Sequence, residues 1–155
     1  MKYFVCLILL SVSLSAVSAQ TNSGINWMSW AQLEQALNKE PKPVFVYFHS
    51  EWCAYCKKIK RKVFTNPEVI QKLNTDYYAV EMDVESKDTI VFDGVIFTNK
   101  QATKKRNGVH ELPLLLASRE NKAFTLPATL FFENAFNIRE RVFKYYTSKQ
   151  LLNKL

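Results

Sequence analysis

Two cysteines separated by two residues form the part of this sequence best suited to chemistry. Cys53 and Cys56 lie in the stretch HSEWCAYCKK, directly after Trp52. A close cysteine pair can carry electrons as a dithiol and disulfide, supply two ligands to a metal ion, or form a structural bridge. The surrounding sequence has to distinguish these three kinds of site.

The first residues favour an oxidising compartment. Lys2 is followed by an apolar run and then by the small-residue sequence SAVSA, which is typical of a secretory signal peptide cleaved after Ala19. The run is shorter than the ~20 residues that a membrane-spanning helix needs. We therefore expect residues 1–19 to be removed near the Ala19-Gln20 bond, and the protein to be periplasmic or secreted.

Loss of the signal peptide would remove Cys6 and leave Cys53 and Cys56 alone. A bridge between them would close a very short loop, which restricts the unfolded chain far less than a long loop does. A structural zinc site needs four ligands, and the two histidines, His49 and His110, lie in separate segments. We predict no metal site and no cofactor beyond the cysteine pair, and we interpret both histidines as surface or packed residues.

The composition favours one domain with a core. The chain has 155 residues, of which 48% are hydrophobic and 14% aromatic. The run KKIKRK places Lys57, Lys58, Arg61 and Lys62 on the solvent side of a predicted helix. We interpret this run as a solvated face, and an acidic partner or support for a thiolate is the alternative. One basic helix face on an exported protein does not predict nucleic-acid binding.

Apolar patterning predicts an α/β sandwich with a mixed sheet. Ser29 and Gln32 form a capping box for the first helix, Asp93-Gly94 suits a two-residue hairpin turn, and Pro113 is tolerated only in a first helical turn. We expect helices over residues 29–39, 56–64, 65–74, 107–117 and 147–155, strands over 44–50, 77–86, 125–132 and 136–146, and a small hairpin over 89–98.

The predicted elements give the two cysteines different environments. Cys53 follows a buried strand and opens a helix, where unpaired N–H groups and the helix dipole favour a thiolate with a pKa below the usual ~8.5. Cys56 lies one turn later on the apolar side, so we expect it to be more buried and less ionised. This asymmetry suits disulfide exchange, in which Cys53 attacks a substrate and Cys56 then attacks the Cys53 sulfur. Trp52 would shield the pair and offer an apolar docking surface.

Three stretches resemble a known family: KPVFVYFHSEWCAYCKK, VFTNPEVIQKLNTDYYAVEMDVES and LPATLFF, within residues 25–155. They are similar to the thioredoxin superfamily, and most of all to exported thioredoxin-like proteins of Gram-negative bacteria near the C-terminal domain of the thiol:disulfide interchange proteins. The resemblance implies a thioredoxin-like fold over residues 20–155, with a central mixed β-sheet flanked by helices. An insert of about residues 86–124 would add a hairpin and a helix before the cis-proline strand.

The resemblance also implies roles for individual residues. Cys53 matches the attacking cysteine and Cys56 the resolving cysteine of the family. Pro127 matches the cis-proline that faces the disulfide, with Leu126 before it, and this backbone edge binds a substrate as an added strand. Together with Trp52, these two residues form the expected substrate-binding set.

Two departures from the family pattern bear on the chemistry. Tyr47 occupies the position of a buried aspartate that moves protons in thioredoxins, and a phenol with a pKa of ~10 cannot do this near neutral pH without a large shift. Proton transfer would then use water, Glu51 or another carboxylate. Ala54 and Tyr55 replace the Gly-Pro of thioredoxin and would tune the redox potential, and Lys57 is a further expected modulator.

The sequence therefore predicts a periplasmic thiol–disulfide oxidoreductase. Resemblance favours a reductase of protein disulfides that is kept reduced by a membrane electron donor. We also expect a monomer. An oxidase or isomerase is the alternative within the same class, and a non-catalytic binding module with a thioredoxin fold is the alternative from another class. The insert either shapes a partner surface or covers an edge of the sheet.

Overall fold

The computed structural model describes residues 24–155. The expected signal peptide and its cleavage site lie outside the described residues. Within the described part, no helix is both long and apolar enough to cross a membrane.

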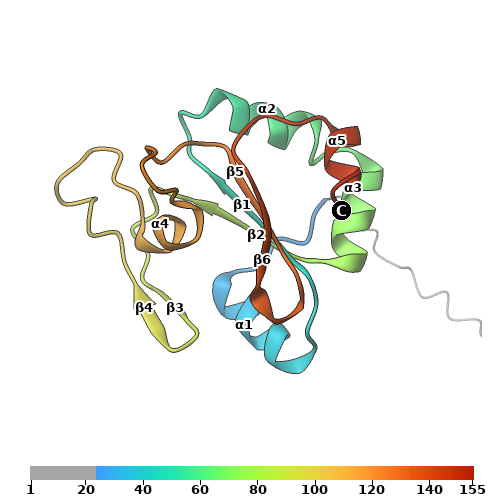
Figure 1. The fold of residues 1–155 in the computed structure, drawn as a ribbon, viewed down its shortest axis with the longest axis horizontal. Coiled ribbons are helices and arrows are strands. Elements are labelled where there is room, and N and C mark those ends of the chain that lie inside the picture. Colours follow the sequence, from blue (N-terminus) through green and yellow to red (C-terminus); the bar gives the residue numbers. More distant parts are fainter. Residues whose placement is uncertain (1–23) are drawn as a thin grey trace, which may run out of the picture.

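A four-stranded mixed sheet forms the centre of the fold (Figure 1). In spatial order the strands are β2 (Tyr78–Asp83), β1 (Val44–His49), β5 (Ala128–Phe132) and β6 (Ile138–Val142). β1 pairs parallel with β2 and antiparallel with β5, which in turn pairs antiparallel with β6. The continuous apolar run in β1 fits its place inside the sheet, where both of its faces are covered.

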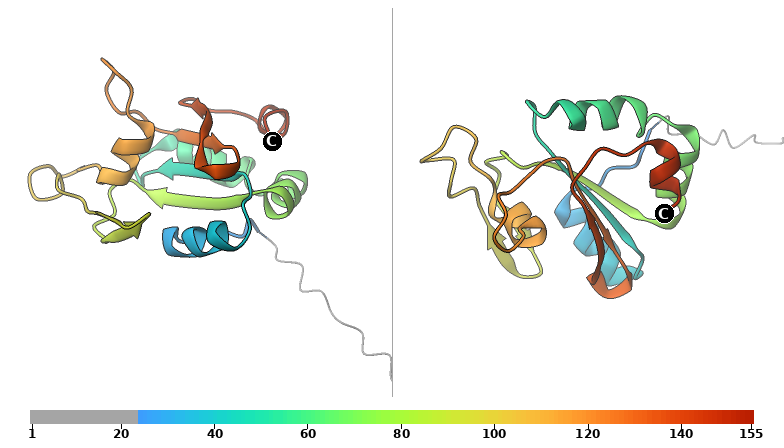
Figure 2. Two further views of the ribbon diagram at one scale, coloured as in Figure 1. Left: turned by 60° about the horizontal axis from the view of Figure 1, so that its bottom comes forward. Right: turned by 45° about the horizontal axis from the view of Figure 1, so that its top comes forward.

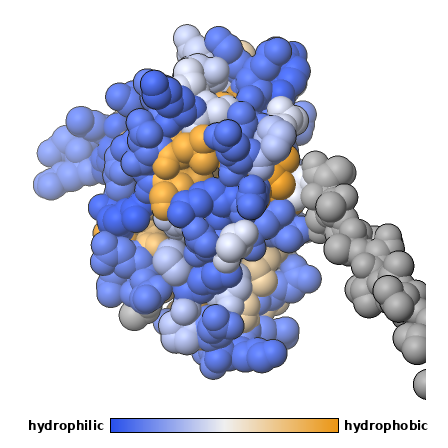
Figure 3. Space-filling model, turned by 90° about the vertical axis from the view of Figure 1, so that its right-hand side faces the viewer, coloured by the Kyte–Doolittle hydropathy of each residue, from blue (hydrophilic) through white to orange (hydrophobic). Residues whose placement is uncertain are grey.

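Helices cover both faces of this sheet (Figures 1 and 2). They are α1 (Trp30–Lys39), α2 (Ala54–Lys62), α3 (Pro67–Asp76), α4 (Glu111–Ala117) and α5 (Ser148–Leu152). One core joins α2, α3 and α5 to Phe45 and Tyr47 of β1, and the other joins α1 and α4 to Val46 and Phe48. The strand thus sends alternate side chains into two cores. The outer side of α3 and α5 is mostly hydrophilic around a small hydrophobic patch (Figure 3).

Helices α1, α3 and α5 begin where the local sequence predicts, whereas α2 begins at Ala54, before the predicted start at residue 56, and α4 at Glu111, after the predicted start at residue 107. Ser29 and Gln32 form the expected capping box of α1, and Asn66 caps α3 with Pro67 as its first residue. Thr147 caps α5. The last strand is shorter than predicted, because a 3₁₀ turn, η1 (Asn134–Phe136), precedes it and the chain leaves the sheet after Val142.

The segment between β2 and β5 holds the predicted hairpin and helix. Its strands are β3 (Ile90–Phe92) and β4 (Val95–Phe97), joined by Asp93 and Gly94 with positive φ angles of 51° and 69°. This two-residue turn is the one predicted from Asp-Gly. Pro113 is the third residue of α4, in its first turn as expected.

Buried polar side chains hold this segment together. His110 is fully buried, and its Nδ1 accepts a hydrogen bond from the Leu112 N–H, so that Nε2 donates to the Asp88 carbonyl. Asn99 Nδ2 donates to the carbonyl oxygens of Ser86 and Gly108. The Asp93 N–H donates to the Glu34 carboxylate of α1, and Arg141 Nε of β6 donates to the Leu116 carbonyl, each at 2.7 Å. The insert is therefore packed against the domain, and it lies at the end of the sheet from which α2 begins (Figure 1).

Candidate active site

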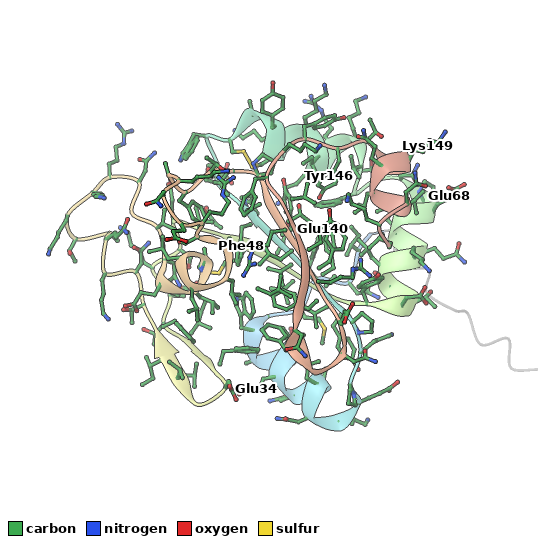
Figure 4. All side chains as sticks on the ribbon, in the orientation of Figure 1. Glu34, Phe48, Glu68, Glu140, Tyr146 and Lys149 are labelled. Atoms are coloured by element: carbon green, nitrogen blue, oxygen red, sulfur yellow. A yellow bond between two sulfur atoms is a disulfide. The ribbon has the colours of Figure 1, made fainter. Side chains whose placement is uncertain are left out.

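Cys53 and Cys56 form a disulfide at the start of α2, which is visible as a yellow bond in Figure 4. Cys53 is the N-cap of this helix, and its Sγ accepts a hydrogen bond from the Cys56 N–H at 3.2 Å. The same N–H and the helix dipole would stabilise a thiolate on Cys53 in the reduced protein. The expected placement of Cys53 at a helix N-terminus is confirmed.

The two sulfur-bearing residues differ in burial. Cys53 is 5% exposed and Cys56 is 1% exposed. Cys56 shares its face of α2 with Ile59, within the core that also contains α3 and α5. This order of burial is the one that the helical spacing predicts.

Two exposed aromatic residues adjoin the cysteines in sequence. Trp52 and Tyr55 are 60% and 61% exposed. The Trp52 indole N–H donates to the Glu85 carboxylate. The centroid of the Tyr55 ring lies 6.2 Å from that of the Tyr145 ring, and Lys58 Nζ lies 4.6 Å from the Tyr145 centroid on the face of the ring. Glu85 and Tyr145 are neighbours that the sequence did not reveal, since they come from distant segments.

The Leu126-Pro127 peptide bond is cis, as expected. The next residue, Ala128, begins β5 and pairs with Phe48 near the end of β1. Leu126 is half-buried and packs against the core that contains both cysteines. Pro127 therefore lies at the end of the sheet from which the chain continues to Cys53.

Tyr47 lies fully buried beneath the first turn of α2. Its hydroxyl donates a hydrogen bond to the Cys56 carbonyl oxygen at 3.2 Å. Burial, followed by the neighbouring Tyr146 and Glu81, raises the pKa of Tyr47 well above its usual range. The phenol therefore stays neutral at neutral pH and supports the helix, in line with the expectation that it cannot replace an aspartate base.

A charged group that the sequence did not single out lies beside Tyr47. Glu81 is the register partner of Tyr47 across the parallel β1–β2 pair. Its Oε2 lies 3.0 Å from Lys60 Nζ and 4.0 Å from His49 Nε2. Alternation along β2 predicts that Glu81 and Asp83 share a face, but the register that sets them beside Tyr47 and His49 is not legible in the sequence.

A pocket of about 440 Å³ opens next to Cys56. It is lined by His49, Ser50, Glu51, Cys56, Lys57, Lys60 and Arg61. Two expected modulators, Glu51 and Lys57, thus lie together at this pocket, while Ala54 is exposed at the start of α2. Burial and the Lys60 ammonium lower the pKa of His49, against the opposing influence of nearby carboxylates. The His49 imidazole is therefore neutral near pH 7.

The described residues contain no cluster of three or more His, Cys, Asp or Glu side chains that could hold a metal ion. His110 uses both ring nitrogens in the insert, and His49 lies on β1 beside the ion pair of Glu81 and Lys60. Sequence reasoning treated His49 as a packed or surface residue, and the structure places it in the same pocket as Cys56.

Known proteins with similar sequences are thioredoxin-related. The chain is 26% identical over 153 residues to the thioredoxin-related protein DsbJ of Chlamydia pneumoniae, covering 95% of this chain and 43% of that relative. It is 23% identical over 127 residues to the thiol:disulfide interchange protein DsbD of Campylobacter jejuni, covering 82% of this chain and 18% of DsbD. The chain thus spans less than half the length of these relatives.

The fold agrees with these relationships. A solved structure of the oxidoreductase DsbH superposes with a TM-score of 0.59 at 18% identity, covering 84% of this chain and 81% of that one. The sequence profile of the thioredoxin-like domain family matches residues 31–155. With a Cys-x-x-Cys disulfide capping α2 and a cis-proline before β5, the chain belongs to the thioredoxin-like domain family.

Proposed function

We propose that this protein is a thiol–disulfide oxidoreductase that exchanges disulfides through Cys53 and Cys56. The observation that carries the proposal is the disulfide at the N-cap of α2, with the more buried Cys56 one turn behind Cys53. An N-cap cysteine has a stabilised thiolate, and a partner within bonding distance can resolve the mixed disulfide. Similarity to proteins named for thiol:disulfide interchange supports the same activity.

The reaction runs as two exchanges. The Cys53 thiolate attacks one sulfur of a substrate disulfide, so that a mixed disulfide forms and the other substrate sulfur leaves as a thiolate. Cys56 then loses its proton and attacks Cys53 Sγ, which forms the protein disulfide and releases the second substrate thiolate. Two electrons pass from the protein to the substrate.

The surface around the pair would bind an extended segment of a substrate protein. Trp52 offers an exposed apolar face, and the backbone of Leu126 and Pro127 lies just before β5, outside its pairing with β1 and β6. In this proposal the mature protein is a periplasmic or secreted monomer that begins near Gln20. A membrane electron donor returns it to the dithiol state, so that it acts as a reductase.

The first experiment is a measurement of the reduction potential of the Cys53–Cys56 pair in dithiothreitol or glutathione buffers. A reversible two-electron couple at about −270 mV supports a reductase, and one at about −120 mV identifies an oxidant instead. A pair without a reversible couple overturns the enzyme proposal and leaves a binding module.

A trapping experiment tests the order of the two cysteines. The Cys56→Ser variant should retain substrates as covalent mixed disulfides on Cys53, because the resolving thiol is absent. The Cys53→Ser variant is the matched control and should trap far less. Equal trapping by both variants contradicts the assigned order.

A further inference from the structure

The resolving step requires a group that accepts the proton of Cys56. A thiol attacks a disulfide only as its thiolate, and burial at 1% exposure disfavours that charge. Tyr47 contacts the backbone of Cys56, yet its hydroxyl donates to the Cys56 carbonyl and stays protonated. The acceptor has to come from another side of Cys56.

Besides Cys56 itself, His49 is the one neutral titratable side chain that lines the pocket beside Cys56. The charged residues that line the pocket are three cations, which cannot accept a proton, and Glu51, which is exposed to solvent. The volume of about 440 Å³ and the polar lining leave room for bridging water. We propose that His49 accepts the proton of the Cys56 thiol through water in this pocket, with Glu81 and Lys60 as positioning residues.

The surroundings of His49 fit this role. Its ring stacks on Tyr47 with centroids 5.9 Å apart, and its side chain is 12% exposed. The charged groups that act on it are Lys60 from α2, Glu81 and Asp83 from β2, and Glu51 from the turn after β1. Burial, and then the Lys60 ammonium that offsets the Glu81 carboxylate, lower the pKa of His49, so the imidazole is neutral at rest and able to accept a proton. The imidazolium that forms then lies beside Glu81.

The inference rests on the proposed exchange function and adds one proton transfer to it. The S–H bond of Cys56 breaks and an N–H bond forms on His49. The thiolate attacks Cys53 Sγ, the bond between Cys53 and the substrate sulfur breaks, and the substrate thiolate leaves. The imidazolium returns its proton to the leaving thiolate or to water, so His49 ends the cycle neutral.

The test separates attack from resolution. Reduced protein is mixed with one equivalent of 4,4′-dithiodipyridine, and release of thiopyridone is followed by stopped flow. The first equivalent reports attack by Cys53, and the second reports resolution by Cys56. In the unmodified protein the resolution rate should rise as the pH passes the pKa of His49, below its usual 6.5, and then stay level until Cys56 itself ionises.

His49→Gln should slow the second phase by about 10²-fold at pH 7 and leave the first phase unchanged. The remaining rate should climb about tenfold per pH unit, because only thiolate formed by bulk water then reacts. Glu51→Gln is the matched control at the same pocket. It removes a carboxylate that raises the pKa of His49 less than Glu81 does, so both phases at pH 7 should stay unchanged and the acid limb should move only slightly to lower pH. An unchanged second phase in His49→Gln overturns the inference.

Two further variants give shifts that a purely structural role does not produce. Lys60→Gln removes a cation that lowers the pKa of His49, so the acid limb should move to higher pH. Glu81→Gln removes a carboxylate that raises this pKa, so the limb should move to lower pH. If His49→Gln also loses its first phase, these two variants test the inference instead: opposite shifts of the acid limb support it, and an unmoved limb in both variants overturns it. If the unmodified protein releases no second equivalent, the exchange function itself fails.

Discussion

Tyr47 places a neutral phenol beneath α2, at the position where thioredoxins have a buried aspartate. A phenol beneath α2 remains neutral and bonds to the Cys56 carbonyl, so no buried charge lies directly under the disulfide. The carboxylate in this region comes from Glu81 on the neighbouring strand, where Lys60 pairs with it. The titratable groups near Cys56 are therefore His49 and Lys60, which line the pocket at its side, and Glu81, which pairs with Lys60.

The Tyr47→Phe variant tests the structural role of that phenol. Loss of the hydrogen bond to Cys56 should lower the free energy of unfolding of the oxidised protein by about 1 kcal/mol. Urea denaturation measures this change. Because Tyr47 does not move protons, the rate of the resolving step at pH 7 should be preserved within about twofold. A large loss of that rate would instead give the phenol a part in proton transfer.

At the scale of elements, the insert depends on a close backbone approach at Gly108. A Cβ placed there would lie 2.5 Å from the carbonyl carbon of Gln101 and 2.6 Å from the Ala102 nitrogen. Gly108→Ala should therefore destabilise the protein by about 1–3 kcal/mol, as overpacking does. Gly24→Ala is the matched control, since its Cβ meets nothing within 4 Å. Urea denaturation should show a loss only for Gly108→Ala, and equal losses would contradict the packing argument.

Acid should weaken the hydrogen bonds between Thr98, directly after β4, and Glu111, the first residue of α4. The Glu111 carboxylate accepts from the Thr98 N–H at 2.8 Å and the Thr98 hydroxyl at 3.1 Å, and it pairs with Lys100. The Lys100 contact, and then the bonds from Thr98, lower the pKa of Glu111 to about 2. The unfolded value is ~4.3, so the stabilisation is complete above that pH and is lost as the pH falls through about 2.

Amide hydrogen exchange at Thr98 measures this effect. Protection of the Thr98 N–H should decline in the unmodified protein as the pH falls from about 4 toward 2, after correction for the intrinsic exchange rate. Glu111→Gln keeps an acceptor oxygen for Thr98 but has no carboxylate to titrate, so its protection should not change with pH over this range. Protection in the unmodified protein that does not change down to pH 2 would contradict the lowered pKa.

Local signals made the elements predictable, and non-local packing limited their lengths. The caps at Ser29 and Asn66 and the turn at Asp93-Gly94 are decided by residues within a few positions of each other. The apolar pattern after Val142 suggested a longer last strand. Instead, Tyr146 turns into the core (Figure 4), where its hydroxyl lies 2.9 Å from the Thr129 hydroxyl. A pattern of apolar residues does not say where a chain leaves its sheet.

At the scale of the whole molecule, one part of the candidate site is predictable from short motifs and another part is not. The cysteine pair and the cis bond at Pro127 are predictable because they lie in short motifs. The group formed by His49, Lys60 and Glu81 is not, because it depends on the register of two parallel strands with α2 and α3 between them in sequence. Neighbours across a parallel pair are fixed only when the whole domain packs.

The full sequence has a net charge of +7, and the positive charge near the site should influence which disulfides reach Cys53 fastest. Lys57, Lys58 and Arg61 are exposed on α2, the helix that Cys53 caps. Positive charge near a thiolate attracts anionic reagents over about one Debye length, ~10 Å at 0.1 M salt. We expect Cys53 to react faster with a dianionic aromatic disulfide than with a neutral one, and added salt to reduce this preference.

A charge-matched pair of variants locates the effect. Replacing Lys57, Lys58 and Arg61 by Gln should reduce the rate with the dianionic reagent by about 10-fold at low salt and change the neutral rate little. Replacing the exposed Lys104, Lys105 and Arg106 of the insert by Gln removes the same total charge. Stopped-flow rates at several salt concentrations compare the two. Equal losses in both would attribute the preference to net charge, whereas a loss confined to the first variant assigns it to the solvent face of α2, where charge and thiolate lie on one helix.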